Sequence, residues 1–330
     1  MNHRPFGKTN RSISEIGYGS WAIGGMWGPL DDAQAKQSLH QAIECGVNFI
    51  DTAAVYGDGH SEQLIGKVVQ ERRKREQIFI ATKVMPKNYQ WPAREKDPAN
   101  EVFPRAWIRE MTERSLKNLR SDYVDLQQLH VWTPRWLQET EWLEELRQLK
   151  EEGKVRAFGV SVNDHDADSA MSLVASGLID SIQIIYNIFE QRPAERLFPL
   201  CQEKQVAVIV RVPFDEGGLT GVLTPTMTFH KKDWRRFYFK PAHLRETCER
   251  VEIVKKILEG ESMTLPEVAL RFCLAHPAVS TVIPGMRTPA HVTSNCAVSD
   301  GRSLSEGLLK SLQAQAWPRN FYPNWDKEGL

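Results

Sequence analysis

The stretch GVNFIDTAAVYGDGHSEQLIG, residues 46–66, shows how this chain joins a strand to a helix. Its apolar run, 47–50, is typical of a strand that is covered on both faces. Asp51 follows the run directly, Tyr56 comes five residues later, and Gly57 and Gly59 lead into a helix-like segment. Because a charge at the end of a buried strand needs a partner, the stretch predicts further polar residues at the ends of other strands.

On both sides of this stretch, β-rich runs alternate with amphipathic helix-like segments. The runs are 15–23, 47–53, 78–84, 123–130, 157–162, 181–187, 206–212 and 279–285. The clearest helical segments are 31–46, with Asp31 or Asp32 as its cap, 105–119 and 137–154. Eight strands alternating with helices predict an α/β fold of the (β/α)₈ (TIM) barrel type. The alternative is a doubly wound open sheet, but no G-x-G-x-x-G motif opens the first βα turn.

Three irregular segments complete the predicted architecture. Residues 6–19 are typical of a short β-hairpin before the first strand, which could plug the bottom of the barrel. The connections 85–105, after the third strand, and 214–242, after the seventh, are long enough to carry function. No Ser/Gly-rich linker or shift in composition divides the chain, so we expect one barrel domain over 1–330.

Composition excludes several classes of protein. The formal net charge is zero, without the basic field of a nucleic-acid binder. No run reaches the roughly 18 apolar residues that span a bilayer, and the first residues lack the apolar core of a signal peptide. The five cysteines are scattered, which disfavours a disulfide framework or a zinc site. We therefore expect a cytoplasmic protein.

Four polar residues follow apolar runs where the active face of a barrel is expected. Asp51 ends the second strand, Tyr56 lies in its loop, Lys83 ends the third strand and His130 ends the fourth. A lysine ammonium lowers the pKa of a nearby phenol, and an aspartate can pair with the buried lysine. A histidine can orient a carbonyl oxygen while the phenol protonates it. Because none of these side chains can supply hydride, the group implies a nicotinamide cofactor.

The chain resembles the aldo-keto reductases over nearly its whole length. The resemblance is carried by GVNFIDTAAVYGDGHSEQLIG, IFIATKV, DYVDLQQLH, GKVRAFGVS, IQIIYN and TVIPGMRTPAHVTSN. It implies a (β/α)₈ barrel that binds NADPH, or less commonly NADH, across its mouth and reduces a small carbonyl compound. The family's catalytic residues fall on Asp51, Tyr56, Lys83 and His130, with Tyr56 as the proton donor.

The resemblance also implies a set of cofactor-binding residues. Arg287 would hold the adenosine 2′-phosphate at a helix N-terminus. Ser161, Asn163 and Gln183 would contact the nicotinamide carboxamide, although the family often has Ser-Asn where this chain has Ser161-Val162-Asn163. The remaining expected residues are Ser20, Trp21, Asp51, Pro213, Gly217, Gly218, Gly221, Gly285, His291 and Asn295.

Arg211 departs from the family pattern. Many members place an aromatic residue at this position, where it stacks on the nicotinamide. A guanidinium plane can also stack on a ring. The alternatives are a bridge from Arg211 to the diphosphate, or to Asp215 or Glu216.

Aromatic residues near the active face predict an apolar substrate pocket. Trp21, Trp27, Trp91 and Trp132 lie in loops or at strand ends. The sequence leaves two alternatives for the basic segment 230–240: a fold over the cofactor or a solvated charged loop. The segment WPRNFYPNW, 317–325, could lie near the pocket or dock elsewhere on the surface.

Two other functions are compatible with a barrel. One is a regulatory or channel-partner protein that binds the cofactor with negligible turnover. The other is a metal-dependent hydrolase, which is disfavoured because no H-x-H pair ends a strand. The sequence leaves open the physiological substrate, the direction of reaction and the oligomeric state.

Overall fold

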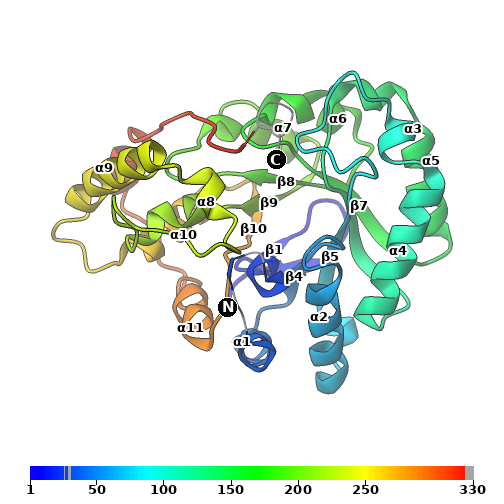
Figure 1. The fold of residues 1–330 in the computed structure, drawn as a ribbon, viewed down its shortest axis with the longest axis horizontal. Helices are drawn as coiled ribbons and strands as arrows, with labels where there is room; N and C mark the ends of the chain where they lie inside the picture. Colours follow the sequence, from blue (N-terminus) through cyan, green and yellow to red (C-terminus); the bar gives the residue numbers. More distant parts are fainter. Residues whose placement is uncertain (26, 29–30, 324–330) are drawn as a thin grey trace.

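The computed structural model describes residues 1–25, 27–28 and 31–323, and parallel strands surrounded by helices form its centre (Figure 1). Each strand pairs with the next one in chain order. The strands are β3 (Tyr18–Gly19), β4 (Phe49–Asp51), β5 (Phe79–Val84), β6 (Val124–Leu129), β7 (Val155–Ser161), β8 (Ser181–Ile185), β9 (Ala207–Arg211) and β10 (Val279–Val282). Bridges from Ile16 to Val282 and from Gly19 to Gly285 join the two edges. The predicted (β/α)₈ barrel is confirmed.

The first strand is shorter than the predicted run 15–23. After β3 the chain turns, and residues Trp21–Gly24 form the 3₁₀ helix η1 instead of continuing the strand. The backbone N–H of Ser20 donates to the carbonyl of Asp51 at 3.1 Å, which fixes the turn beside β4. This early exit from the sheet brings Trp21 to the barrel mouth, where its ring lies 6.3 Å from that of Tyr56.

Helices cover the outside of the barrel (Figure 1). They are α1 (Asp32–Glu44), α2 (His60–Arg72), α3 (Ala99–Val102), α4 (Arg105–Leu119), α5 (Glu141–Glu151), α6 (Met171–Ser176), α7 (Leu197–Glu203), α8 (Arg235–Tyr238), α9 (Pro241–Ile257), α10 (Leu265–Ala275), α11 (Pro289–Ala297) and α12 (Glu306–Gln313). Asp31 caps α1 by accepting from the N–H of Ala33, as predicted. The predicted helix 137–154 is shorter, because Pro134–Gln138 forms a separate 3₁₀ turn before α5.

An N-terminal hairpin closes the bottom of the barrel. Its strands β1 (His3–Pro5) and β2 (Ser12–Ser14) pair antiparallel, so it begins three residues before the predicted start. Phe6 and Ile13 are fully buried in one cluster with inward-facing residues of the strands. The ring of Phe6 lies 4.7 Å from that of Phe79. Apolar side chains therefore close this end of the barrel. Burying a phenylalanine side chain contributes about 1.5–3 kcal/mol to the stability of the fold.

The two long connections follow β5 and β9, as predicted. The first reaches α3 without regular structure, and the second contains η6 (Asp215–Thr220) and α8 before α9. Tyr238, Phe239, Leu244 and Cys248 form a separate apolar cluster on α8 and α9. Among the described residues, no helix is long and apolar enough to cross a membrane. The cysteines are free thiols.

Candidate active site

Residues from three adjacent elements meet at the mouth of the barrel. Asp51 is the last residue of β4, Lys83 lies near the end of β5, and His130 follows β6 directly. Tyr56 lies in the loop between β4 and α2. Parallel strands place their C-terminal ends on one face, so the fold gathers these four side chains as the sequence predicts.

Lys83 is the centre of this group. Its side chain is fully buried and donates from Nζ to Asp51 Oδ1 at 2.6 Å and to the carbonyl of Thr52 at 2.8 Å. The same Nζ lies 3.4 Å from the hydroxyl of Tyr56. A buried ammonium needs such partners, because desolvation would otherwise neutralise it. Burial is the largest influence and lowers the pKa of Lys83, but Asp51 and Tyr56 together outweigh it, so the pKa is raised. Lys83 therefore remains an ammonium beside the phenol.

The phenol of Tyr56 differs from the sequence prediction in one respect. Burial raises its pKa, while the charge of Lys83 acts to lower it. Asp51 cancels part of the effect of Lys83, so the net shift is upward, whereas we predicted a net lowering. Tyr56 is therefore a neutral phenol at neutral pH, which is the form that can give a proton.

His130 faces Tyr56 across the mouth. Their ring centroids are 6.0 Å apart, and the ring of Trp91 lies 5.9 Å from His130 at right angles to it. Burial, together with the charges of Lys83 and Arg211, holds the pKa of His130 well below its usual value. Its Nδ1 is buried and has no partner among the described residues. His130 is therefore a neutral imidazole with a ring nitrogen available for a ligand.

Two of the three side chains predicted to contact a carboxamide, Gln183 and Asn163, have hydrogen-bond partners within the protein. Gln183 donates from Nε2 to Asp51 Oδ2 at 2.7 Å, so it belongs to the same hydrogen-bond network as Lys83. Asn163 is bound to the backbone of Ala93, in the loop after β5, by its Oδ1 at 3.1 Å. Ser161 is buried at the end of β7. Ser20 is also buried, and its hydroxyl accepts from that of Ser61 at 2.8 Å.

Arg211 pairs with a carboxylate that the sequence did not indicate. Its Nη2 donates to Asp164 Oδ1 at 2.7 Å and to the carbonyl of Val162 at 3.0 Å. The carboxylates of Asp215 and Glu216, the alternatives from sequence, accept hydrogen bonds from other residues. The Nε of Arg211 is buried and without a partner among the described residues. The side chain is thus held at the end of β9 through Nη2, with Nε left without a partner in the described part of the chain.

The backbone conformation and the packing of the loop after β9 account for its glycines. Gly217 has φ +102° and Gly221 has φ +75°, values that residues with a side chain rarely adopt. A Cβ at Gly218 would lie 2.9 Å from Thr247 and 3.1 Å from the Asp215 carboxylate. These glycines therefore serve the backbone and its packing. Pro213 is buried at the start of the loop.

The residues predicted for the adenosine end gather around the start of α11. Thr288 caps this helix by accepting from the N–H of His291. Arg287 donates to the carbonyl of Trp27 at 2.9 Å. His291 is exposed and Asn295 is buried. A Cβ at Gly285 would meet nothing within 4 Å, so the chain leaves open space there.

Three of the four predicted pocket tryptophans lie near the mouth. Trp21 lies 6.3 Å from Tyr56 and 5.9 Å from Trp27, and Trp91 flanks His130. The prediction for Trp132 is wrong. It is fully buried against Trp136 and Trp142, with ring distances of 5.9 and 5.3 Å, because the chain after β6 turns into the core.

The sequence did not identify Trp234 as part of the mouth. This residue belongs to the segment 230–240, and its ring lies 5.1 Å from that of Trp21. A bridge between Trp27 and Asp233 brings the same segment to the loop after β3. The segment therefore lies at the mouth, as one of the two sequence alternatives requires.

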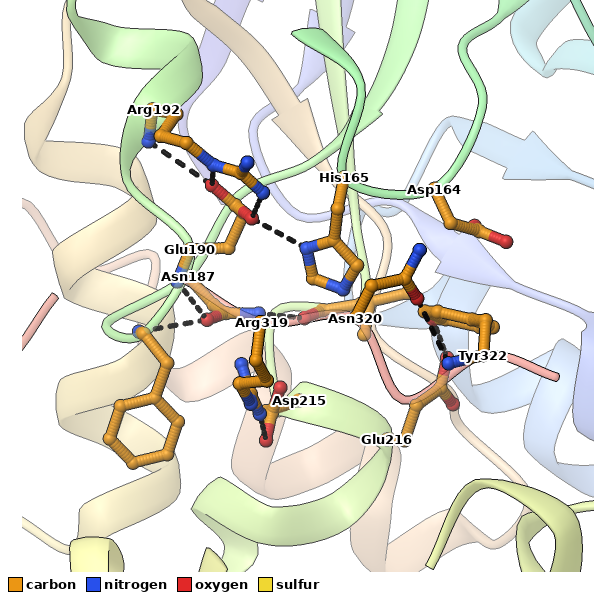
Figure 2. Close-up of polar contacts among 12 residues, drawn as sticks. Asp164, His165, Asn187, Glu190, Arg192, Asp215, Glu216, Arg319, Asn320 and Tyr322 are labelled. Carbon is orange, nitrogen blue, oxygen red and sulfur yellow. Dashed lines mark hydrogen bonds and ion pairs between the residues drawn. The ribbon is translucent and has the colours of Figure 1, made fainter. Parts of the chain in front are cut away.

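The tail also reaches the mouth. The ring of Tyr322 stacks on Trp234 at 5.7 Å. Arg319 donates a hydrogen bond to Asp215 (Figure 2). This agrees with one of the two sequence alternatives for 317–325, the one near the pocket; Asn324 and Trp325 lie outside the described residues. Nothing in the local sequence pattern pointed to Asp164, Arg319 or Tyr322.

Buried donors at the mouth test whether a nicotinamide coenzyme fits. Trp27 Nε1, Trp234 Nε1, Arg211 Nε and His130 Nδ1 all lack hydrogen-bond partners in the described part of the chain. Buried polar atoms are normally satisfied, so the mouth suits a ligand rich in acceptors, such as an amide joined to phosphates. Nowhere in the described ranges of the chain are three His, Cys, Asp or Glu side chains grouped so that they could hold a metal ion.

Comparison with known proteins gives matches along most of the chain. The Aldo/keto reductase family model matches residues 15–314. The chain is 32% identical over 301 residues to the aldo-keto reductase YhdN of Bacillus subtilis, covering 88% of this chain and 87% of that protein. It is 30% identical over 333 residues to the NADH-specific methylglyoxal reductase of Escherichia coli, covering 97% and 100%. The solved holo form of the aldo-keto reductase AKR11C1 from Bacillus halodurans has a TM-score of 0.75 at 28% identity, over 96% of each chain.

Proposed function

The chain belongs to the aldo/keto reductase family, and we propose that it reduces aldehydes and ketones to alcohols with NADPH. The observation that carries the proposal is the position of Lys83 Nζ, 2.6 Å from Asp51 and 3.4 Å from the Tyr56 hydroxyl. A buried ammonium at this distance stabilises the phenolate that remains after Tyr56 has given up its proton.

Each side chain of the site has a separate role in the reduction of a carbonyl group. The bound coenzyme supplies hydride to the carbonyl carbon. Tyr56 donates its proton to the carbonyl oxygen, and Lys83 stabilises the phenolate that forms. Asp51 keeps Lys83 charged through the 2.6 Å pair, and Gln183 holds the other oxygen of Asp51 at 2.7 Å. Neutral His130, facing Tyr56, orients the carbonyl oxygen by a hydrogen bond.

The surroundings of Tyr56 favour an apolar substrate. Trp21 and Trp91 flank the pair formed by Tyr56 and His130, so a planar or aromatic carbonyl compound would bury its apolar part against indole rings. We infer that aromatic aldehydes and ketones are better substrates than small hydrophilic ones.

Arg287 supports NADPH as the coenzyme. It lies just before α11, where a guanidinium can bind a 2′-phosphate through two hydrogen bonds. The related methylglyoxal reductase of Escherichia coli is NADH-specific, so NADH is the competing coenzyme. If Arg287 holds the phosphate, the preference for NADPH falls at least tenfold in Arg287→Leu and the Kd for NADH stays the same. An equal loss for both coenzymes would refute this role.

Turnover by Tyr56→Phe tests the reaction itself. The experiment follows NADPH absorbance with purified protein and a panel of aldehydes and ketones. We expect the wild type to consume NADPH and Tyr56→Phe to lose at least about a thousandfold in kcat, because the proton donor is gone. The variant should still bind NADPH. Full activity in Tyr56→Phe would refute the mechanism, and tight NADPH binding without turnover in the wild type would identify a regulatory protein.

A further inference from the structure

The loop after β9 adopts an unusual backbone conformation. Val212, Asp215 and Glu216 have φ of +56°, +50° and +54°, and Gly217 follows at +102°. Side chains other than glycine seldom adopt the left-handed region, and the cost is largest for a β-branched residue such as Val212. Such a conformation persists only where surrounding groups hold it. The groups that hold this loop therefore decide whether it keeps this conformation.

Two side chains of the tail bind the two acids of this loop. Asp215 and Glu216 are 1% and 3% exposed. Arg319 Nη2 donates to Asp215 Oδ2 at 2.5 Å, and the hydroxyl of Tyr322 donates to Glu216 (Figure 2). Tyr238 also donates to Asp215, at 3.4 Å. Both carboxylates are thus held by residues more than 100 positions further along the chain.

Arg319 is confined by aromatic rings. Its guanidinium carbon lies 4.1 Å from the ring centre of Trp317, 5.2 Å from Phe321 and 5.5 Å from Phe189. The backbone N–H of Trp317 donates to the carbonyl of Phe189 at 2.8 Å, which fixes the start of the tail. Among the described residues, Nε and Nη1 of Arg319 have no hydrogen-bond partner. The bond to Asp215 is therefore the directional contact of this side chain.

Tyr322 is confined in the same way. Its ring stacks on Trp234 at 5.7 Å and lies 4.9 Å from Tyr238 and 5.7 Å from His165. Figure 2 shows His165 between Glu190 and the tail residues Asn320 and Tyr322. His165 is bound to Glu190, which Arg192 also holds. The hydroxyl of Tyr322 thus reaches Glu216 from a ring that Trp234, Tyr238 and His165 surround.

The two acids would oppose a polyanionic ligand. The proposed function requires the diphosphate of the coenzyme to pass near the mouth, and adjacent free carboxylates would repel it. Arg319 neutralises the charge of Asp215. Burial raises the pKa of Glu216 to about 8, so this side chain is largely uncharged at neutral pH. The tail and burial together thus remove the negative charge of the loop.

We propose that Arg319 and Tyr322 are positioning residues of the coenzyme site. From the tail they bind Asp215 and Glu216 and fix the loop after β9 in its left-handed conformation, and Arg319 neutralises Asp215 so that it does not repel the diphosphate. This inference rests on the proposed function, since it needs the same coenzyme at the same mouth. It adds the tail as the element that sets coenzyme affinity.

The test measures NADPH binding directly, by quenching of tryptophan fluorescence in the full-length protein. We expect Arg319→Gln to raise the Kd about tenfold and to change the KM for the carbonyl substrate less than threefold. The matched control is Arg250→Gln. Arg250 also lies over Trp317, at 5.3 Å, and its loss leaves the bond between Arg319 and Asp215 in place. We expect the control to bind NADPH as the wild type does.

A double variant separates charge neutralisation from simple destabilisation. Asp215→Asn combined with Arg319→Gln removes the acid together with its partner, and asparagine tolerates a positive φ. We expect the double variant to recover NADPH affinity to within threefold of the wild type. Affinity that stays as low as in Arg319→Gln would overturn the charge-neutralising role.

Tyr322→Phe provides a second route if Arg319→Gln does not fold. This variant keeps the stacked ring and removes only the hydroxyl. We expect the Kd for NADPH to rise about threefold and amide hydrogen exchange over residues 212–221 to accelerate in the free protein. An unchanged Kd and unchanged exchange would overturn the inference alone. A wild type that binds neither NADPH nor NADH would overturn the proposed function as well.

Discussion

Two buried acid–base pairs stand at the same mouth and are built in different ways. Asp51 and Lys83 lie on the adjacent strands β4 and β5, and Lys83 makes three polar contacts. Asp215 and Arg319 join a loop to the tail, 104 residues apart. Arg319 has one hydrogen-bonded side-chain partner in the described structure and otherwise packs against aromatic rings.

Because one pair lies on adjacent strands and the other joins a loop to the tail, we expect the two pairs to have different functions. Strands in a closed barrel hold their side chains to within a narrow range of positions, as the proposed proton transfer from Tyr56 to a substrate requires. The tail docks through ring contacts, one ion pair and two hydrogen bonds, all of them outside the sheet, so losing these contacts would not disturb the strands. The pair on the strands therefore suits chemistry, and the pair from the tail suits the binding and release of a large ligand.

Breaking the strand pair should have the largest effect. Lys83→Met removes the charge that stabilises the Tyr56 phenolate, so we expect kcat to fall by about a thousandfold or more. It also leaves Asp51 buried without its cation, which should lower the free energy of unfolding by about 3–5 kcal/mol. Steady-state kinetics and urea unfolding measure the two losses. Lys117→Met, at an exposed position of α4, is the control. If Lys83→Met kept more than a tenth of the wild-type kcat, the pair of Asp51 and Lys83 would not have the central role in catalysis that we propose.

The loop held by the tail should respond to pH. Burial raises the pKa of Glu216 from 4.5 to about 8, so the folded protein binds a proton that the unfolded chain has lost between these values. This contribution to stability is present at low pH and is lost as pH rises through about 8. We expect it to fall by on the order of 3 kcal/mol between pH 5 and pH 8. Urea unfolding of the wild type and Glu216→Gln across this range measures the slope. Equal slopes in both proteins would contradict the assignment.

The sequence predicted the strand pair because topology orders it. Asp51 and Lys83 each follow an apolar run, and consecutive parallel strands bring their C-terminal ends to one face. Side chains that lie together because their strands are neighbours in the sheet can therefore be predicted from the strand ends alone. The same reasoning was insufficient for Trp132. It also follows a strand, but the direction in which the chain turns after β6 depends on its packing against Trp136 and Trp142.

The tail pair could not be predicted from local patterns. Asp215 and Arg319 belong to irregular segments, and no period of 2 or 3.6 residues relates them. Their contact depends on where α12 ends and how the aromatic residues of the tail pack on Trp234 and Phe189. For this reason the sequence left open whether the tail lies near the mouth or elsewhere. It likewise offered Asp215 and Glu216, but not Asp164, as partners for Arg211.

Gln183 gives the smallest and sharpest test of the comparison. Family resemblance predicted a contact with the carboxamide of the coenzyme, whereas the structure shows its amide donating to Asp51 at 2.7 Å. If Gln183 positions Asp51 within the strand pair, Gln183→Leu should lower kcat about tenfold, equivalent to about 1.4 kcal/mol, and leave the Kd for NADPH unchanged. If it holds the carboxamide, the Kd should rise instead.

Gln127→Leu is the matched control for that measurement. Gln127 is equally buried, on β6, and neither polar atom of its side chain has a partner among the described residues. Replacing it removes a buried amide without breaking a hydrogen bond, so kcat should not change and stability should not fall. A loss of kcat in Gln183→Leu alone would extend the strand pair to a third strand, β8. Equal losses in both variants would mean that the barrel responds to packing and not to the bond between Gln183 and Asp51.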